Sequence, residues 1–245
     1  MAKAPKKSKI EEISLESVMM NCRNALRGKV GGNEKNRDTV MGLVFLNFVG
    51  DKFYARRAEI MVQYPGIFWE NEAFYRSENV FYINESSRWD YIVQQASSDD
   101  IAIKLDRAMA NIEERNPPLK GALPQNFYAT LGIGKKEIKS LIDEVNKLDN
   151  NRFHEKDLIG RVQEYFLQVF AIDSGVGKEK GEFYTPSSIV TLIAELIEPY
   201  NGTVYDPCCG TGGMFVQSLK FVENHQGNKK NISIIGQESN PDTWR

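Results

Sequence analysis

Residues 203–213 constrain the fold of this chain more than any other segment. Their sequence, Thr-Val-Tyr-Asp-Pro-Cys-Cys-Gly-Thr-Gly-Gly, predicts a short strand at 203–205, an acidic residue at its end and a glycine-rich turn. A helix is expected to follow at 214–223. A strand that runs through a tight turn into a helix is typical of a site for a nucleotide-type ligand.

The pattern around this turn alternates between helix and strand. A helix is expected at 186–198, before the turn, and a second strand at 232–235, after it. This order predicts an α/β fold of Rossmann-like type with an incomplete parallel sheet, of which the chain holds only the first two strands. The carboxyl ends of parallel strands meet at one edge, so Asp206 and Glu238 are expected to face the same ligand.

The residues before the turn predict an α-helical domain. Ser14 is expected to cap a first helix, in which Val18, Cys22 and Leu26 recur at helical spacing. Further helices are expected at 37–63, 99–114, 135–147 and 155–170, and a short strand at 80–83. The buried positions expected in the 37–63 helix include Val40, Val44, Phe48 and Phe53.

The composition changes at 173–181, where the sequence Asp-Ser-Gly-Val-Gly-Lys-Glu-Lys-Gly is rich in glycine and charge and poor in apolar residues. Such a segment is typical of a flexible linker between domains. We therefore expect a disordered basic tail at 1–10, a helical N-terminal domain at 11–172, the linker at 173–181 and the start of the α/β domain at 182–245.

Charge and apolar patterning exclude several classes of protein. The formal net charge is −2, so any affinity for DNA must come from a local patch or from partners. The three cysteines form no disulfide framework and no zinc-binding spacing. The longest apolar stretch, at 41–49, is far shorter than the ~20 residues of a membrane-spanning helix, and the lysine-rich start has no signal-peptide core. We expect a cytoplasmic protein with no membrane association and no metal site.

The turn also selects among nucleotide-type ligands. It lacks the Gly-x-x-x-x-Gly-Lys-[Ser/Thr] sequence of a phosphate-binding loop and the Gly-x-Gly-x-x-Gly sequence of a dinucleotide site. Asp206 stands just before the glycines, and its carboxylate would repel a phosphate and attract a cation. S-adenosylmethionine carries an ammonium and a sulfonium and no phosphate, so the charge favours this cofactor over a nicotinamide dinucleotide.

Several segments together resemble a known family. The cofactor motif of one family resembles the segment Asp206-Pro-Cys-Cys-Gly-Thr-Gly-Gly-Met-Phe. This family is the modification (M) subunit of type I restriction-modification systems, and its members are DNA adenine N6-methyltransferases. Gly181-Glu-Phe-Tyr-Thr-Pro is similar to the family's other cofactor motif, and Gly236-Gln-Glu-Ser-Asn-Pro-Asp-Thr-Trp to the segment with its ribose-binding acid. Leu43-Val-Phe-Leu and Arg56-Arg-Ala-Glu resemble parts of its helical N-terminal domain.

The resemblance implies a role for each matching residue. Residues 183–186 would line the methionine and adenine side of S-adenosylmethionine, Asp206 would hold the methionine amino group, and Glu238 would bind the ribose. The candidate cofactor-binding residues are Glu182, Phe183, Tyr184, Thr185, Pro186, Ser187, Asp206, Gly210, Thr211, Gly212, Gly213 and Glu238. Taken alone, 184–186 would also suit a helix entry, and Glu238 a solvated carboxylate. The implied partners are DNA, a specificity subunit, a restriction subunit and a second M subunit.

A further motif of this family, [Asn/Asp]-Pro-Pro-[Tyr/Phe], binds the adenine amino group and stacks on the flipped base. The Asn-Pro-Pro at 116–118 precedes the cofactor motifs, follows a charged helix and continues with Leu119 rather than an aromatic residue. We interpret it as a helix terminator. The chain is therefore expected to be the N-terminal part of a longer M subunit, with the catalytic motif beyond Arg245, and to be inactive in methyl transfer on its own.

Two other functions remain as alternatives. A non-catalytic interaction module would use the helical domain alone, and a nicotinamide-dependent oxidoreductase would need to bind a pyrophosphate at the turn. Titration with S-adenosylmethionine and with NAD distinguishes the oxidoreductase from the methyltransferase. A catalytic motif encoded beyond Arg245 would distinguish the methyltransferase from the interaction module.

Overall fold

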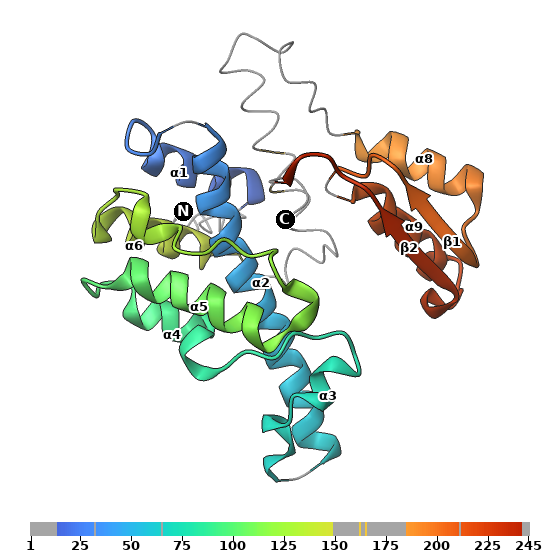
Figure 1. Cartoon of the computed structure of the whole chain (residues 1–245), viewed down its shortest axis with the longest axis horizontal. Coiled ribbons are helices and arrows are strands. Elements are labelled where there is room, and N and C mark those ends of the chain that lie inside the picture. Colours follow the sequence, from blue (N-terminus) through green and yellow to red (C-terminus); the bar gives the residue numbers. More distant parts are fainter. Residues whose placement is uncertain are drawn as a thin grey trace, which may run out of the picture.

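The computed structural model describes residues 14–31, 33–64, 66–148, 162, 165, 185–210 and 212–241. The described elements form two groups, a set of helices from α1 to α6 and an α/β unit made of α8, β1, α9 and β2 (Figure 1). Each group buries its own apolar cluster. The expected tail at 1–10 and linker at 173–181 lie outside the described residues, as does the expected helix at 155–170 apart from Val162 and Tyr165.

The first group consists of helices joined by short turns. The helices are α1 (Leu15–Leu26), α2 (Asn33–Gln63), α3 (Ala73–Arg76), α4 (Trp89–Gln95), α5 (Ile101–Arg115) and α6 (Lys135–Val145). Single 3-10 turns lie between them: η1 (Ile67–Glu70), η2 (Glu85–Ser87), η3 (Pro117–Leu119) and η4 (Tyr128–Thr130). The Ser14 cap is confirmed, because its Oγ accepts the backbone N–H of Ser17 at 3.1 Å. This bond satisfies one of the donors that a helix start leaves unpaired.

The long helix α2 runs through this group and packs against α1, α4 and α6 (Figure 1). Val40, Val44 and Phe53 are fully buried in its core, as their spacing predicts. Phe48 is only half-buried, so the prediction for this position was too strong. The helix also begins at Asn33 rather than near residue 37, which adds a turn to its N-terminal end.

The predicted strand at 80–83 is wrong. These residues are extended, but they pair with no strand in the part of the chain that the structure describes. The Asn116 side chain takes the place of a partner strand: its Oδ1 accepts the Tyr82 N–H at 3.0 Å, and its Nδ2 donates to the Tyr82 carbonyl at 3.0 Å. A side-chain amide can therefore satisfy the same backbone groups that a neighbouring strand would.

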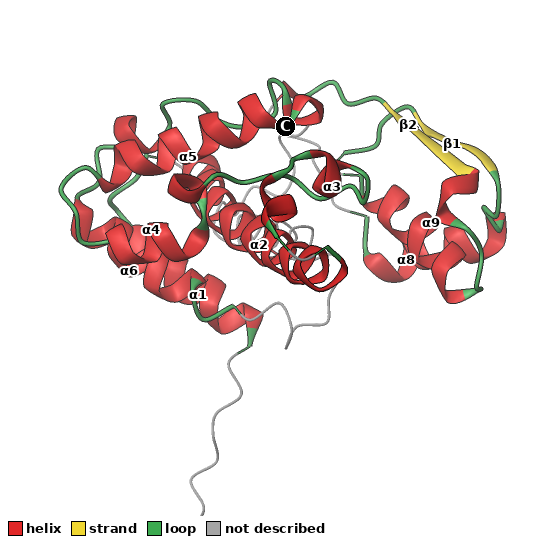
Figure 2. Ribbon diagram, turned by 90° about the horizontal axis from the view of Figure 1, so that it is seen from below, coloured by secondary structure: helices red, strands yellow, loops and turns green. Residues whose placement is uncertain are grey.

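The second group is the start of a parallel α/β unit, as predicted. Its elements are α8 (Ser187–Ile197), β1 (Gly202–Asp206), α9 (Gly213–Asn224) and β2 (Ile232–Gly236). The strands pair in parallel from Gly202 opposite Ile232 to Asp206 opposite Gly236. In Figure 2 both helices lie on the same side of this pair of strands, and α8 packs on α9. The small core between them contains Ala194, Phe221, Val222 and Ile232.

Much of the apolar surface of this unit is open. Leu192, Leu196 and Ile197 of α8 are 59%, 75% and 67% exposed, and Tyr205 and Ile235 of the strands are more than half exposed. Two strands cannot bury both of their faces, which is the behaviour expected for the first part of a larger sheet. None of the helices in the described ranges combines the length and apolar character that a bilayer crossing requires.

Candidate functional site

The turn between β1 and α9 has the backbone shape that its glycines predict. Gly210 has φ +55° and Gly212 has φ +82°, both in the left-handed region that side chains with a Cβ rarely adopt. Gly212 is the N-cap of α9, so the helix begins at the residue that directly follows the turn. Asp206, the last residue of β1, braces the turn, because its Oδ1 accepts the Cys208 N–H at 3.0 Å. The start of α9 therefore lies at the carboxyl edge of the sheet, where α/β proteins bind ligands.

Hydrogen bonds join the two loops beyond the ends of the strands. Gln237 donates its N–H to the Asp206 carbonyl at 2.9 Å and accepts the Cys209 N–H at 2.9 Å. Its side-chain Oε1 also accepts the Tyr205 hydroxyl at 2.8 Å. Gln237 thus extends the pairing of β1 and β2 into the turn, and this residue carried no signal in the sequence beyond its place after a strand.

Gly236 is a second feature that sequence reasoning missed. A Cβ at this position would lie 2.8 Å from the Cys209 Sγ and 2.8 Å from the Phe215 ring. The glycine-rich turn and the first turn of α9 therefore approach the end of β2 as closely as the backbone allows. A glycine at the end of a predicted strand was the available signal, because such glycines mark close approach of other atoms.

Glu238 lies in the second loop with its carboxylate directed at backbone N–H groups. The Asn240 N–H donates to its Oε1 at 2.7 Å. This bond is the main cause that lowers the pKa of Glu238, and the N–H groups of Ser239 and Gly210 lower it further. The Gly210 contribution connects Glu238 to the glycine-rich turn, so the two acidic positions predicted from the sequence lie at the same edge of the sheet.

The thiol of Cys209 is close enough to both acidic groups to be affected by their charges. Burial raises its pKa, and the charges of Asp206 and Glu238 raise it further. Cys209 is therefore held as a neutral thiol, which favours the role of a small residue under a tight turn over that of a nucleophile at this position. The described residues contain no cluster of three or more side chains of the types that bind metal ions.

The upstream candidate residues are only partly described. Thr185 and Pro186 are exposed, and Pro186 is the N-cap of α8, where its carbonyl accepts the Ile189 N–H at 2.9 Å. For Thr185 and Pro186, this geometry agrees with a helix entry. Ser187 begins α8. Four of the predicted positions, Glu182, Phe183, Tyr184 and Thr211, lie outside the described residues.

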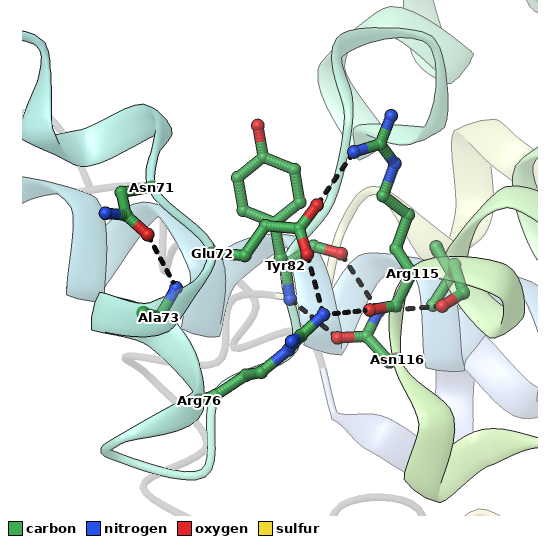
Figure 3. A network of polar contacts seen from close by, with 8 residues as sticks. Asn71, Glu72, Ala73, Arg76, Tyr82, Arg115 and Asn116 are labelled. Carbon is green, nitrogen blue, oxygen red and sulfur yellow. Dashed lines mark hydrogen bonds and ion pairs between the residues drawn. The ribbon is translucent and has the colours of Figure 1, made fainter.

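The Asn-Pro-Pro sequence at 116–118 is structural. Asn116 is 2% exposed, and besides its bonds to Tyr82 its Nδ2 donates to the Ile112 carbonyl at 2.7 Å (Figure 3). Both donors and the acceptor of the side-chain amide are used inside the protein, so it has no free group to offer to a nucleobase. Pro117 and Pro118 begin the 3-10 turn η3 directly after α5, which confirms the predicted helix end.

Two known families match successive parts of the chain. The family described as HsdM N-terminal domain matches residues 15–148, and the family described as N-6 DNA Methylase matches residues 154–245. The type I restriction enzyme MjaIX methylase subunit of Methanocaldococcus jannaschii is 34% identical over 222 residues, which cover 84% of this chain and 39% of that protein. The HindI methylase subunit of Haemophilus influenzae is 42% identical over 155 residues, which cover 59% of this chain and 34% of that protein.

Solved structures support the fold. A type I restriction-modification methyltransferase subunit from Streptococcus thermophilus superposes with a TM-score of 0.63 at 20% identity, over 94% of this chain and 53% of that one. The chain thus spans well under half the length of the two curated relatives. The helical part, the parallel α/β start and both family matches agree: this chain belongs to the methylase (M) subunit family of type I restriction-modification systems.

Proposed function

We propose that this chain is the N-terminal portion of an M subunit that transfers a methyl group from S-adenosylmethionine to adenine N6 in DNA. The observation that supports this most is the edge where β1 and β2 end. There, Asp206 ends β1 and Glu238 lies in the loop after the parallel strand β2, and the two are connected through Gln237 and the Gly210 turn. The match of residues 154–245 to N-6 DNA Methylase favours the reaction class.

The residues at this edge suit the proposed cofactor. The carboxylate of Asp206 would attract the methionine ammonium, and Glu238 has acceptor oxygens for ribose hydroxyls. Gly210 and Gly212 keep side chains away from the turn, so a ligand can approach its backbone. The bound cofactor would supply an electrophilic methyl group on a sulfonium. The other candidate positions, Glu182, Phe183, Tyr184, Thr185, Pro186, Ser187, Thr211 and Gly213, are part of this proposal.

The wider assembly is also a proposal. A helical domain at 11–172 with its own core would provide contacts to DNA and to other subunits. The named relatives are subunits of type I restriction enzymes, which favours a specificity subunit, a restriction subunit and a second M subunit as partners. The formal net charge of −2 agrees with DNA binding in which partner subunits supply part of the contact, rather than binding by this chain alone.

Calorimetric titration tests the cofactor. We expect the chain to bind S-adenosylmethionine and not NAD, because the carboxylate of Asp206 opposes a pyrophosphate. Replacing Glu238 with glutamine should weaken binding about tenfold or more, since a charged acceptor of hydrogen bonds is lost. Glu78→Gln, an exposed glutamate of the helical part, is the matched control and should change nothing. Binding of NAD without S-adenosylmethionine would refute the assignment.

The low pKa of Glu238 gives this titration a pH dependence with a definite sign. The carboxylate stays ionised below the usual range of a glutamate, because the Asn240 N–H stabilises its charged form. Affinity that depends on this charge should therefore hold from neutral pH through the ordinary glutamate range, and fall only in more acidic solution. A loss of affinity that begins near pH 6 would contradict this role for Glu238.

A radiolabelled methyl-transfer assay tests the second half of the proposal. The chain has no [Asn/Asp]-Pro-Pro-[Tyr/Phe] sequence. The side-chain amide of Asn116 is already hydrogen-bonded to the backbone of Tyr82 and Ile112. We expect no incorporation of methyl groups into adenine-containing DNA by residues 1–245 alone. Incorporation by this chain would mean that another group presents the adenine. If the calorimetric titration shows binding of neither S-adenosylmethionine nor NAD, the result would instead favour a non-catalytic interaction module.

A further inference from the structure

The Tyr205 hydroxyl is bound within the protein although more than half of this residue is exposed to solvent. Tyr205 lies in β1 and pairs in register with Ile235 of β2, which is exposed to a similar degree. Side chains alternate along a strand, and the half-buried Val204 and Asp206 flank Tyr205. Tyr205 therefore lies on the face of the sheet away from α8 and α9 (Figure 2).

This hydroxyl donates to a side chain from the loop after β2. The acceptor is the Oε1 of Gln237, at 2.8 Å. The Gln237 N–H donates to the Asp206 carbonyl and its own carbonyl accepts the Cys209 N–H, both at 2.9 Å. These two bonds fix the backbone of Gln237, and the bond from Tyr205 fixes its side chain as well. Water can also satisfy an exposed hydroxyl, so the main effect of this bond is on the position of Gln237 rather than on stability.

The next residue, Glu238, directs its carboxylate at a different set of groups. Gln237 is exposed and Glu238 is half-buried, as expected where consecutive side chains leave the chain on opposite sides. The Oε1 of Glu238 accepts the Asn240 N–H at 2.7 Å, and the Gly210 N–H also contributes to its low pKa. Gly210 belongs to the loop after β1, so its contact with Glu238 depends on how the loop after β2 is turned.

We propose that Tyr205 is a positioning residue for the ribose end of the cofactor site. By holding the Gln237 side chain on one side of the loop, its hydroxyl turns Glu238 toward the glycine-rich turn. A carboxylate that is oriented before the ligand arrives loses less conformational entropy on binding. This inference rests on the proposed function, because it assigns a support to the residue proposed to bind the ribose.

Titration of the Glu238 carboxyl in the ligand-free chain tests the positioning. Carbon-13 nuclear magnetic resonance follows its ionisation in the wild type and in Tyr205→Phe, which loses only the hydroxyl. We expect the pKa of Glu238 to rise in the variant, because the Gly210 N–H no longer faces the carboxylate. The pKa should stay below its ordinary value, since the Asn240 N–H lies in the same loop as Glu238.

Tyr200→Phe is the matched control. Tyr200 precedes β1 at the opposite end of the sheet and contacts Phe221 and His225 through its ring. Loss of its hydroxyl should leave the pKa of Glu238 unchanged. Asp206 and Cys209, the titratable groups close to Glu238, are the same in both variants. Circular dichroism checks that each variant is folded.

Calorimetric titration with S-adenosylmethionine measures the effect on binding. Tyr205→Phe should bind about threefold to tenfold more weakly than the wild type, as expected for the loss of one hydrogen bond that orients a contact. In a Glu238→Ala background there is no carboxylate to position, so Tyr205→Phe should have no further effect. An equal loss in both backgrounds would overturn the proposal, because Tyr205 would then act by another route.

The outcomes separate this inference from the function on which it rests. Failure of the wild-type chain to bind S-adenosylmethionine would overturn the cofactor assignment, and with it the ribose role of Tyr205. If the wild type binds and Tyr205→Phe matches it in both affinity and the pKa of Glu238, only the positioning role is overturned. A change in just one of the two quantities also overturns it, because the effect must pass through Glu238.

Discussion

Replacing Asp106 with alanine is expected to lower the free energy of unfolding of the helical group by about 3 kcal/mol. Asp106 is 6% exposed, and its Oδ1 accepts the N–H groups of Phe127 and Tyr128, both at 2.9 Å, while its Oδ2 accepts that of Ala129 at 2.9 Å. One carboxylate of α5 thus holds the start of the 3-10 turn η4. Alanine would leave a buried N–H without an acceptor, and charge-assisted bonds are the stronger kind.

Urea denaturation followed by circular dichroism measures this loss. Asp106→Asn should fall between wild type and Asp106→Ala, because one amide oxygen can accept two of the three N–H groups. The control is Asp143→Ala, which removes an exposed pair with Lys139 and should cost at most about 0.5 kcal/mol. Equal losses for Asp106→Ala and Asp143→Ala would show that Asp106 does not support η4.

Replacing Gly236 with valine is expected to reduce binding of S-adenosylmethionine by about tenfold to a hundredfold. An added Cβ would lie 2.8 Å from both the Cys209 Sγ and the Phe215 ring. The turn and the first residues of α9 would have to move, and overpacking of this kind costs about 1–3 kcal/mol. The displaced turn carries the proposed contacts of Asp206 and Gly210 to the ligand.

Calorimetry on a graded series makes this test specific. Gly236→Ala should weaken binding less than Gly236→Val, since it adds only the Cβ. Gly31→Ala is the control, because an added Cβ there meets nothing within 4 Å. The helical group should unfold at the same urea concentration in all three variants. Unchanged affinity in Gly236→Val would mean that the close approach to β2 has no part in the site.

The local features of the α/β start could be predicted from the sequence. The strand, the glycine-rich turn and the following helix depend on neighbouring residues, and they appear within one or two residues of the expected bounds. Asp206 and Glu238 were placed correctly at one edge because parallel strands align their ends by geometry alone. The burial of Val40, Val44 and Phe53 followed from helical spacing for the same local reason.

The features that depend on distant residues were missed. Nothing near Asp106 in the sequence indicates that it binds N–H groups more than 20 residues later. The strand error at 80–83 has a similar origin, because the partner of Tyr82 is the side chain of Asn116 rather than another strand. Gly236 and Gln237 act through loops that meet only in the folded chain. Contacts of this kind leave no periodic pattern to read.

The hydrogen bonds of Gln237 would couple the binding of a ligand's two ends at the two loops. Gln237 donates to the Asp206 carbonyl and accepts from the Cys209 N–H, so backbone hydrogen bonds connect the loops after β1 and β2. For a cofactor held at its amino-acid end by one loop and at its sugar by the other, occupation of either half would pre-order the other. Separate adenosine and methionine would then bind with positive cooperativity, through the backbone rather than through contact with each other.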